Sequence, residues 1–184
     1  MNANEAINAQ ISQTLKARRK ERGWSLDKTA QQTGVSKAML GQIERQESSP
    51  TIATLWKIAT GLQCSFSSFL IPGAADPATS MPSENDGFAG DNNMKVKTLF
   101  PYSPITRSEM FEITLTSHHQ QLSTPHQAGV LEHIHVIEGK LEILQQDVWH
   151  PVNTGEQYLL AADGEHGYRD LSGKTRFIDM IFYP

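Results

Sequence analysis

The stretch 125–139, PHQAGVLEHIHVIEG, concentrates side chains that can hold a metal ion or transfer a proton. It contains three histidines and two glutamates: His126, Glu132, His133, His135 and Glu138. Imidazole nitrogens and carboxylate oxygens are ligands of zinc and iron in proteins. The alternating apolar residues of VLEHIHVIEG predict a β-strand, so the faces of that strand decide which of these groups can act together.

Successive side chains of a strand point to opposite faces. If Glu132 points into the protein, His133 and His135 both point away from it. We therefore expect this H-x-H pair to lie at the surface or against another sheet or subunit, and not to bind a metal. Solvated side chains are likewise expected at three other histidines, the last of them in a turn: His118, His119 and His150.

Composition excludes several classes of protein. The 184-residue chain is 38% hydrophobic and contains one cysteine, Cys64. No apolar run is long enough to cross a bilayer, and the polar start MNANEAINAQ lacks the apolar segment of a secretory signal. A single cysteine cannot form an intramolecular disulfide, so Cys64 is expected to be a buried thiol. We expect a cytoplasmic protein with no membrane partner.

Charge divides the chain into two unlike parts. The formal net charge is −4 in total, but it is +4 through Ile71 and −8 from Pro72 onward. All seven histidines lie in the second part. Such asymmetry is typical of a basic nucleic-acid-binding domain joined to a domain with another task.

Periodicity supports the same division. Residues 1–71 repeat apolar side chains at helical spacing and predict a domain of five short helices. Residues 72–94 are rich in Pro, Gly and small polar side chains and predict a flexible linker. In residues 95–184 the period changes to two, with turn residues between the segments, which predicts an all-β barrel or sandwich.

The sequence TGVS between two helical segments predicts a helix-turn-helix. Gly34 suits the left-handed backbone of a tight turn, Val35 can fill the angle between the helices, and Ser36 can cap the second helix. An ordinary helical bundle has the same local features, so the exposed side chains of the second helix decide between the two interpretations.

The second helix, SKAMLGQIER, carries side chains that can recognise bases. Lys37, Ala38 and Gln42 share one face, and three apolar residues are expected on the other: Met39, Leu40 and Ile43. Gln can make two hydrogen bonds with adenine, Ala can contact a thymine methyl, and Lys can reach guanine or a phosphate.

The stretch LKARRKERGWSLDKTAQQTGVSKAMLGQIERQESSPTIATLWKIATGL resembles the xenobiotic-response-element (XRE) family of bacterial regulators. That family shows R-x-x-R-G-x-S, T-G-V-S, I-E-R-x-x-x-x-P and T-L-x-K-I-A in this order, and the resemblance covers nearly all of residues 11–71. It implies a lambda-repressor-like, all-α domain, although Thr29 stands where the family usually has Leu. It also implies base contacts by four residues and DNA-backbone contacts by three others: Ser36, Lys37, Ala38 and Gln42, then Arg19, Ser25 and Arg45.

The second part of the chain resembles a cupin, a double-stranded β-barrel that binds metals or organic ligands in its interior. The first cupin motif is H-x-H, three or four residues, E, six residues, G, and the second is G, five residues, P-x-G, two residues, H. The chain keeps His126, Glu132 and His166 at the ligand positions, whereas Ala128 replaces the second His. Three further positions depart from the motifs: Gln120, Ala161 and Asp163.

The resemblance leaves three interpretations of His126, Glu132 and His166. Two histidines and a carboxylate can hold a divalent metal, although a family site that has lost one ligand is expected to bind more weakly. The same groups can orient a small organic effector in a pocket. They can also satisfy only one another in a closed barrel. No metal or other cofactor is assigned with certainty.

Helix-turn-helix, linker and cupin in this order resemble transcriptional regulators whose barrel senses a small molecule, and in particular a bacterial sulfur-utilisation regulator. This implies a homodimer on double-stranded operator DNA, with recognition helices about 34 Å apart, and an effector that is a candidate sulfur metabolite. One alternative is a metal-dependent dioxygenase or isomerase with an added DNA-binding module, which the loss of a ligand at Ala128 disfavours. Another is an antitoxin-like or scaffolding protein.

Overall fold

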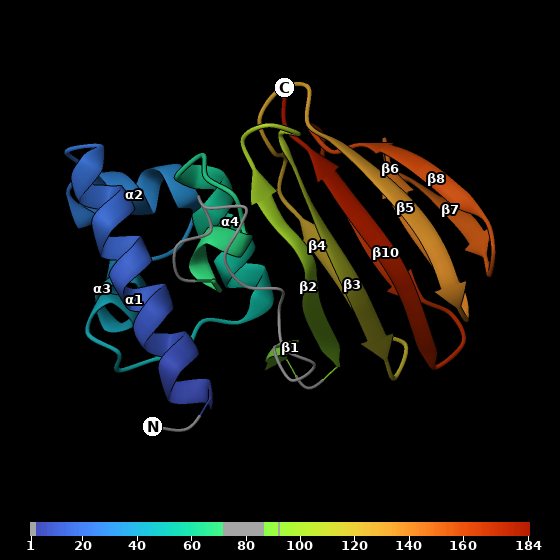
Figure 1. Ribbon diagram of the computed structural model, residues 1–184, viewed down its shortest axis with the longest axis horizontal. Coiled ribbons are helices and arrows are strands. Elements are labelled where there is room, and N and C mark those ends of the chain that lie inside the picture. Colours follow the sequence, from blue (N-terminus) through green and yellow to red (C-terminus); the bar gives the residue numbers. More distant parts are fainter. Residues whose placement is uncertain (1–2, 72–86, 92) are drawn as a thin grey trace.

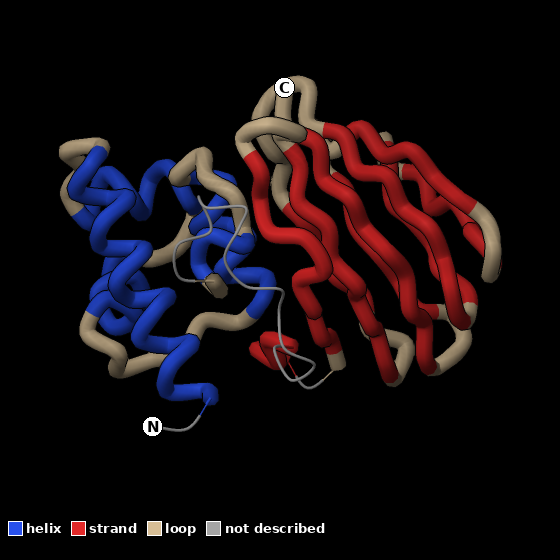
Figure 2. Tube along the Cα trace, viewed as in Figure 1, coloured by secondary structure: helices blue, strands red, loops and turns tan. Residues whose placement is uncertain are grey.

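A helical domain packs against a β-domain (Figure 1). This computed structural model describes residues 3–71, 87–91 and 93–184. Helices and strands are fully segregated between the two domains (Figure 2). In the described part of the chain, no helix is both long and apolar enough to cross a membrane.

The helical domain contains four α-helices and a short 3-10 turn, η1. Their bounds are α1 Ala3–Glu21, α2 Leu26–Thr33, α3 Lys37–Glu44, α4 Ile52–Gly61 and η1 Ser67–Phe69. The sequence predicted five helices, but the fifth is this single 3-10 turn, because a segment of that length cannot sustain α-helical hydrogen bonding. The first helix also begins earlier than the apolar pattern indicates.

Local sequence signals account for the helix-turn-helix. The Ser25 hydroxyl accepts a hydrogen bond from the Lys28 N–H at the start of α2, and the Ser36 hydroxyl accepts one from the Met39 N–H at the start of α3. Gly34 ends α2 with φ 67°, in the left-handed region that favours glycine. Thr29 is fully buried, and its hydroxyl donates to the Ser25 carbonyl oxygen at 2.9 Å, so the departure from the family's Leu is accommodated.

The β-domain consists of two antiparallel sheets. The strands are β1 Gly87–Asp91, β2 Met94–Ser103, β3 Ser108–Thr116, β4 Gln120–Ser123, β5 Leu131–Glu138, β6 Lys140–Gln145, β7 Val148–Asn153, β8 Gln157–Ala161, β9 His166–Asp170 and β10 Lys174–Phe182. The larger sheet has the order β1-β2-β3-β10-β5-β8 and the smaller has β4-β9-β6-β7. Alternating side chains of both sheets fill the space between them.

The sequence missed four of these strands: β1, β4, β7 and β9. Residues 87–91 were expected within the linker but pair with β2, whereas residues 72–86 lie outside the described part of the chain. His150 was expected in a turn, yet it lies in β7 and its ring is 5.5 Å from that of Tyr158. Short strands such as β4 and β9 give too little alternation to be recognised locally.

Aromatic side chains join the two domains into one core. Trp56 of α4 stacks on Phe66 with ring centroids 4.0 Å apart, and its edge meets Phe111 of β3 at 5.8 Å. Phe66 and Phe111 are fully buried and lie 5.6 Å apart in an edge-to-face arrangement. The domains are therefore packed directly on one another and are not held together by the linker alone.

A buried carboxylate fixes this contact. Glu109 of β3 accepts hydrogen bonds from the backbone N–H groups of Phe66 at 3.0 Å and Ser67 at 2.9 Å, and it also accepts one from the Tyr183 hydroxyl. Burial raises the pKa of this carboxyl above its usual range, while the hydrogen bonds from Ser67 and Tyr183 oppose that shift. The β-domain thus supplies acceptors to the otherwise unpaired start of η1.

We expect Glu109→Gln to lower the free energy of unfolding by about 1–3 kcal/mol. An amide has one oxygen acceptor, so one of the two backbone N–H groups would face an NH2 group without an acceptor. Urea denaturation measures the change. Glu112→Gln on the opposite face of β3 is the matched control and should shift stability by less than about 0.5 kcal/mol. An equal effect of the two substitutions would contradict the role given to Glu109.

Candidate DNA-binding face and barrel site

The face of α3 that is expected to contact DNA is exposed. Four of the predicted contact residues lie there with solvent-accessible side chains: Ser36, Lys37, Ala38 and Gln42. Leu40 and Ile43 are buried beneath them, as the sequence predicts. Met39 was expected to face inward, but it is 39% exposed, because Leu40 and Ile43 already occupy the narrow inner face of this short helix.

The cations of this domain differ in their availability to DNA. Arg19 is only 14% exposed, and its guanidinium donates to both carboxylate oxygens of Glu44, at 2.6 and 2.9 Å, and to the Trp24 carbonyl oxygen. The hydrogen bond to Glu44 raises the pKa of Arg19 further. In this arrangement Arg19 joins α1 to α3, and a phosphate contact by Arg19 stays a prediction.

Lys37 and Arg45 can exchange their carboxylate partners for DNA phosphates. Each is 59% exposed, and each pairs with one exposed carboxylate, Lys37 with Asp27 at 2.8 Å and Arg45 with Glu47 at 2.7 Å. Exposed ion pairs of this kind contribute little to stability. A phosphate can therefore replace the carboxylate at either cation with little loss of fold stability.

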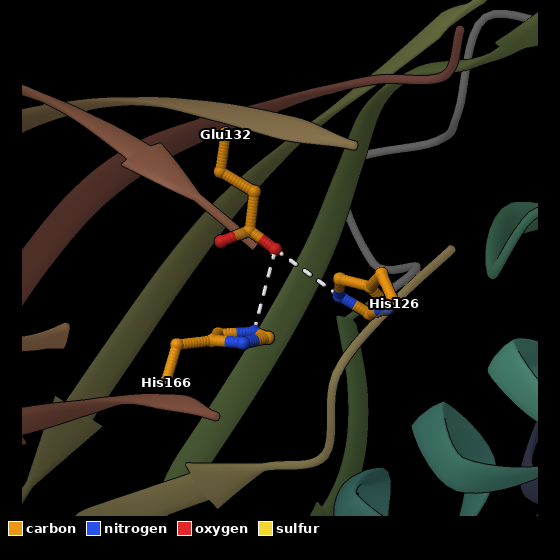
Figure 3. Close-up of side chains that lie close together, drawn as sticks. All are labelled: His126, Glu132 and His166. Carbon is orange, nitrogen blue, oxygen red and sulfur yellow. Dashed lines mark hydrogen bonds and ion pairs between the residues drawn. The ribbon is translucent and has the colours of Figure 1, made fainter. Parts of the chain in front are cut away.

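The second site lies inside the barrel, where His126, Glu132 and His166 converge (Figure 3). His126 comes from the β4–β5 loop, Glu132 from β5 and His166 from the start of β9. Glu132 Oε1 is 3.2 Å from His126 Nε2 and 3.6 Å from His166 Nε2. The structure thus brings together the three ligand positions of the cupin motifs.

The structure places the other motif positions outside this cluster. Burial alternates along β5, so Glu132 is buried while His133 is exposed and His135 is partly exposed. His135 Nδ1 is 3.0 Å from Gln157 Nε2 at the surface. Ala128, which replaces the second cupin His, is exposed in the β4–β5 loop. Asp163 accepts a hydrogen bond from the Gly129 N–H and so holds this loop in place.

In both histidines the ring nitrogen that does not face Glu132, Nδ1, takes part in a hydrogen bond that orients the ring. His166 Nδ1 is 2.9 Å from the Gly164 carbonyl oxygen, which can only accept, so Nδ1 carries the hydrogen and Nε2 is left facing Glu132. His126 Nδ1 is 2.9 Å from the hydroxyl of Thr60 in α4. Such partners of the second ring nitrogen are typical of metal-binding histidines, because they fix the tautomer and the ring orientation.

Two further titratable residues, Tyr168 and Asp179, border the cluster. Tyr168 donates a hydrogen bond to Glu132 Oε2, and burial raises the pKa of Tyr168 well above its usual range. Burial also raises the pKa of Glu132, but the hydrogen bond from His126 and the charges of both histidines lower it more. Asp179 of β10 is buried, and its Oδ1 has no hydrogen-bond partner in the described part of the chain.

The pKa values of Asp179 and Glu132 are shifted in opposite directions. Burial, and then the negative charges of Glu132 and Glu109, raise the pKa of Asp179 well above the usual carboxyl range. The arrangement keeps Glu132 ionised and favours a neutral Asp179. Sequence reasoning missed Asp179, Tyr168 and Thr60. Period-two alternation along β10 places Asp179 inward. Burial along β9 does not alternate, so it gives no such signal for Tyr168, and nothing in the sequence places Thr60 beside His126.

The space at the three ligand positions is small. The cavity bordered by His126, Glu132 and His166 has a volume of about 10 Å³. Such a space holds a single water molecule or an ion. The three ligand atoms lie within 4.8 Å of one another and one of them is a carboxylate, so the residues fit a divalent cation. The described conformation does not leave room there for an organic molecule.

Comparison with known proteins relates the chain to bacterial regulators. The helix-turn-helix family HTH_3 matches residues 15–69. The HTH-type transcriptional regulator SutR of Escherichia coli (strain K12) is 48% identical over 175 residues, which cover 95% of each chain. A crystal structure of an HTH_3 family transcriptional regulator from Vibrio cholerae superposes with a TM-score of 0.84 and 50% identity, covering 98% of both chains.

A crystal structure of the Cupin_2 domain of an XRE family transcriptional regulator from Enterobacter cloacae is 36% identical. It covers 50% of this chain and 99% of that domain, with a TM-score of 0.49.

The relatives from Escherichia coli and Vibrio cholerae match both domains together and not the helix-turn-helix alone. The chain belongs to the XRE-type (HTH_3) family of transcriptional regulators, with a helix-turn-helix domain followed by a cupin barrel.

Proposed function

We propose that this regulator recognises its operator with the exposed face of α3. Gln42 and Ala38 would contact base edges in the major groove, with Lys37 and Ser36 beside them and with Ser25 and Arg45 at the phosphates. The support is the exposure of this face above the buried Leu40 and Ile43. Met39 is exposed on the same helix and adds an apolar side chain that can contact a thymine methyl.

We also propose that the protein acts as a homodimer in the cytoplasm, where the operator DNA is accessible. One module of this size contacts few base pairs, so a second copy is needed for useful affinity and specificity. A two-fold axis would present two α3 helices to successive major grooves of a near-palindromic site.

The barrel is the sensing part of this proposal, and the observation that carries it is the position of His126. One ring nitrogen of His126 faces Glu132 in the barrel and the other contacts Thr60 in the DNA-binding domain. If neutral His126 carries its hydrogen on Nε2, Nε2–H would donate to Glu132 and Nδ1 would accept from the Thr60 hydroxyl. A cation at Nε2 would require the other tautomer, in which Nδ1–H would donate to Thr60. Occupancy of the barrel would then reverse the hydrogen bond between His126 and Thr60 of α4.

Such a reversal can couple the barrel site to the DNA-binding face of α3 only under one condition. The cation must bind with different affinity to two arrangements of the helical domain and the β-domain. The resident group would be a divalent cation held by His126, Glu132 and His166, whose role is to supply a fixed positive charge. The relatives named as regulators support this role over a dioxygenase or an isomerase. The resemblance to a sulfur-utilisation regulator makes sulfur compounds the first candidates for a separate organic effector.

Gln42→Ala tests the recognition helix. The substitution should reduce discrimination at one base pair per half-site by about 1–3 kcal/mol, because it removes the paired hydrogen bonds to a base. Competition binding with operator variants at a fixed salt concentration measures this. Gln13→Ala, on the exposed surface of α1, is the control and should leave the base preference intact. Unchanged discrimination in Gln42→Ala would mean that another side chain recognises that base.

Arg45→Gln tests the phosphate contact. Binding to operator and to unrelated DNA should weaken together, and the slope of log affinity against log salt should flatten by about 0.9 for each phosphate that the protein no longer neutralises. Titrations at several salt concentrations give both quantities, with Lys16→Gln on the exposed face of α1 as the control. A loss confined to the operator sequence would instead make Arg45 a base-recognising residue.

The metal content of untagged, purified protein tests the barrel site. We expect close to one equivalent of a divalent metal, its loss in His126→Ala because a ligand is removed, and its retention in His133→Ala because that side chain points outward. Elemental mass spectrometry of the two variants and the parent gives the answer. Metal-free parent protein, or equal retention in both variants, would leave the trio as a hydrogen-bonded cluster.

A further inference from the structure

A second and much larger cavity lies between the two domains. Its volume is about 340 Å³, and both domains contribute to its wall. Arg18 of α1 and Thr60 of α4 come from the helical domain, whereas Tyr102 of β2, His126 and Tyr183 come from the β-domain. Cavities that bind small organic molecules typically measure about 300–1,000 Å³, so this cavity can accept a small metabolite.

The charge in the wall favours an anion. Arg18 is the permanently charged residue of the lining, and no acidic side chain among the described residues lines the cavity. The side chain of Arg18 is 45% exposed, and its guanidinium pairs at 3.1 Å with Glu21, whose side chain is 60% exposed. An exposed pair of this kind is weak, so a ligand carboxylate or sulfonate can engage the remaining donors of Arg18.

The remainder of the cavity wall suits the uncharged portion of such a ligand, with its apolar and weakly polar groups. The rings of Trp56, Tyr102 and Tyr183 supply flat apolar surface, with Tyr102 and Tyr183 held edge to face at 5.6 Å. Gln63 and Gln127 offer amide groups from the two opposite sides. The Tyr183 hydroxyl already donates to Glu109, so the cavity wall is fixed by the same buried carboxylate that joins the domains.

The cavity and the barrel site have different capacities but share two residues. Trp56 and His126 line both, and the space inside the barrel is only about 10 Å³. An organic molecule therefore fits on the outer side of His126, next to its contact with Thr60, and an ion fits on the inner side.

We propose that this interdomain cavity binds a small organic anion, with its carboxylate or sulfonate at Arg18 and its apolar body against Trp56, Tyr102 and Tyr183. The regulatory consequence rests on the function proposed above. A ligand held by both domains stabilises the arrangement in which α1 and α4 lie against the barrel, and through them it influences the spacing of the two α3 helices in a dimer. The binding itself does not depend on that function.

Calorimetric titration of the full-length protein tests the site. The probes are benzoate, benzenesulfonate and N-acetyl-L-methionine, with uncharged benzamide as the partner of benzoate. We expect at least one of the three anions to bind saturably, and benzoate to bind more tightly than benzamide. Arg18→Gln should weaken anion binding about tenfold or more, because it removes a charge-assisted, bidentate contact, and should leave benzamide binding unchanged.

Lys20→Gln is the matched control, since it removes one positive charge from an exposed position of α1 that does not line the cavity. It should leave anion binding at the parental level. Saturable binding by none of the three anions, or equal weakening by the two substitutions, would overturn the inference. Anion binding that is lost in Glu132→Gln but kept in Arg18→Gln would place the ligand inside the barrel and would also overturn it.

These outcomes are separable from those of the proposed function. Metal content and operator binding are measured without any organic anion. If the protein holds its metal and binds DNA but no anion, the cavity inference alone fails. If anions bind as expected but the barrel is metal-free, the sensing proposal for the barrel fails and the cavity inference stands.

Discussion

The burial of Glu109 under the helical domain is the contact on which the rest of the molecule depends. A carboxylate without water is costly unless its oxygens are hydrogen-bonded, and here the Phe66 and Ser67 N–H groups and the Tyr183 hydroxyl provide those bonds. The hydrogen bonds from the two backbone N–H groups form only when the start of η1 lies on β3. Together with the stacked Trp56, this fixes α4 over the barrel and brings Thr60 within hydrogen-bonding distance of His126.

That placement gives the barrel site two different neighbours. Toward the interior, the two histidines lower the pKa of Glu132 while burial raises the pKa of Asp179, which favours negative charge on the carboxylate that faces the imidazoles. Toward the helical domain, His126 forms part of a cavity that a small molecule can enter. An ion and an organic anion would therefore act on opposite sides of one imidazole ring, which is a physical basis for coupling two signals.

The DNA-binding domain shows a similar division between fixed and exchangeable groups. Arg19 is held by Glu44 and the Trp24 carbonyl, which makes it part of the α1–α3 contact, whereas Lys37 and Arg45 form exposed ion pairs. The fixed ion pair holds α3 against α1, and the exposed cations would be available to DNA phosphates under the proposed function. Under the proposed function, a signal from the barrel would reach this surface through α4 and through α2, which contacts both α4 and α3.

The sequence by itself determined the features that depend on local chemistry. Glycine at a left-handed turn, serine at helix starts and the period of apolar residues predicted the helices, the turn between α2 and α3 and the all-β domain. The side chains of α3 and the XRE motifs were needed to identify the helix-turn-helix, and the outward direction of His133 followed once Glu132 was placed inward. The resemblance to the cupin motifs implied the convergence of His126, Glu132 and His166. Only the tertiary structure decided the contact of Thr60 with His126, the role of Glu109, and the small interior beside a larger interdomain cavity. These features depend on side chains far apart in the chain, and packing between domains leaves no periodic signal in the sequence.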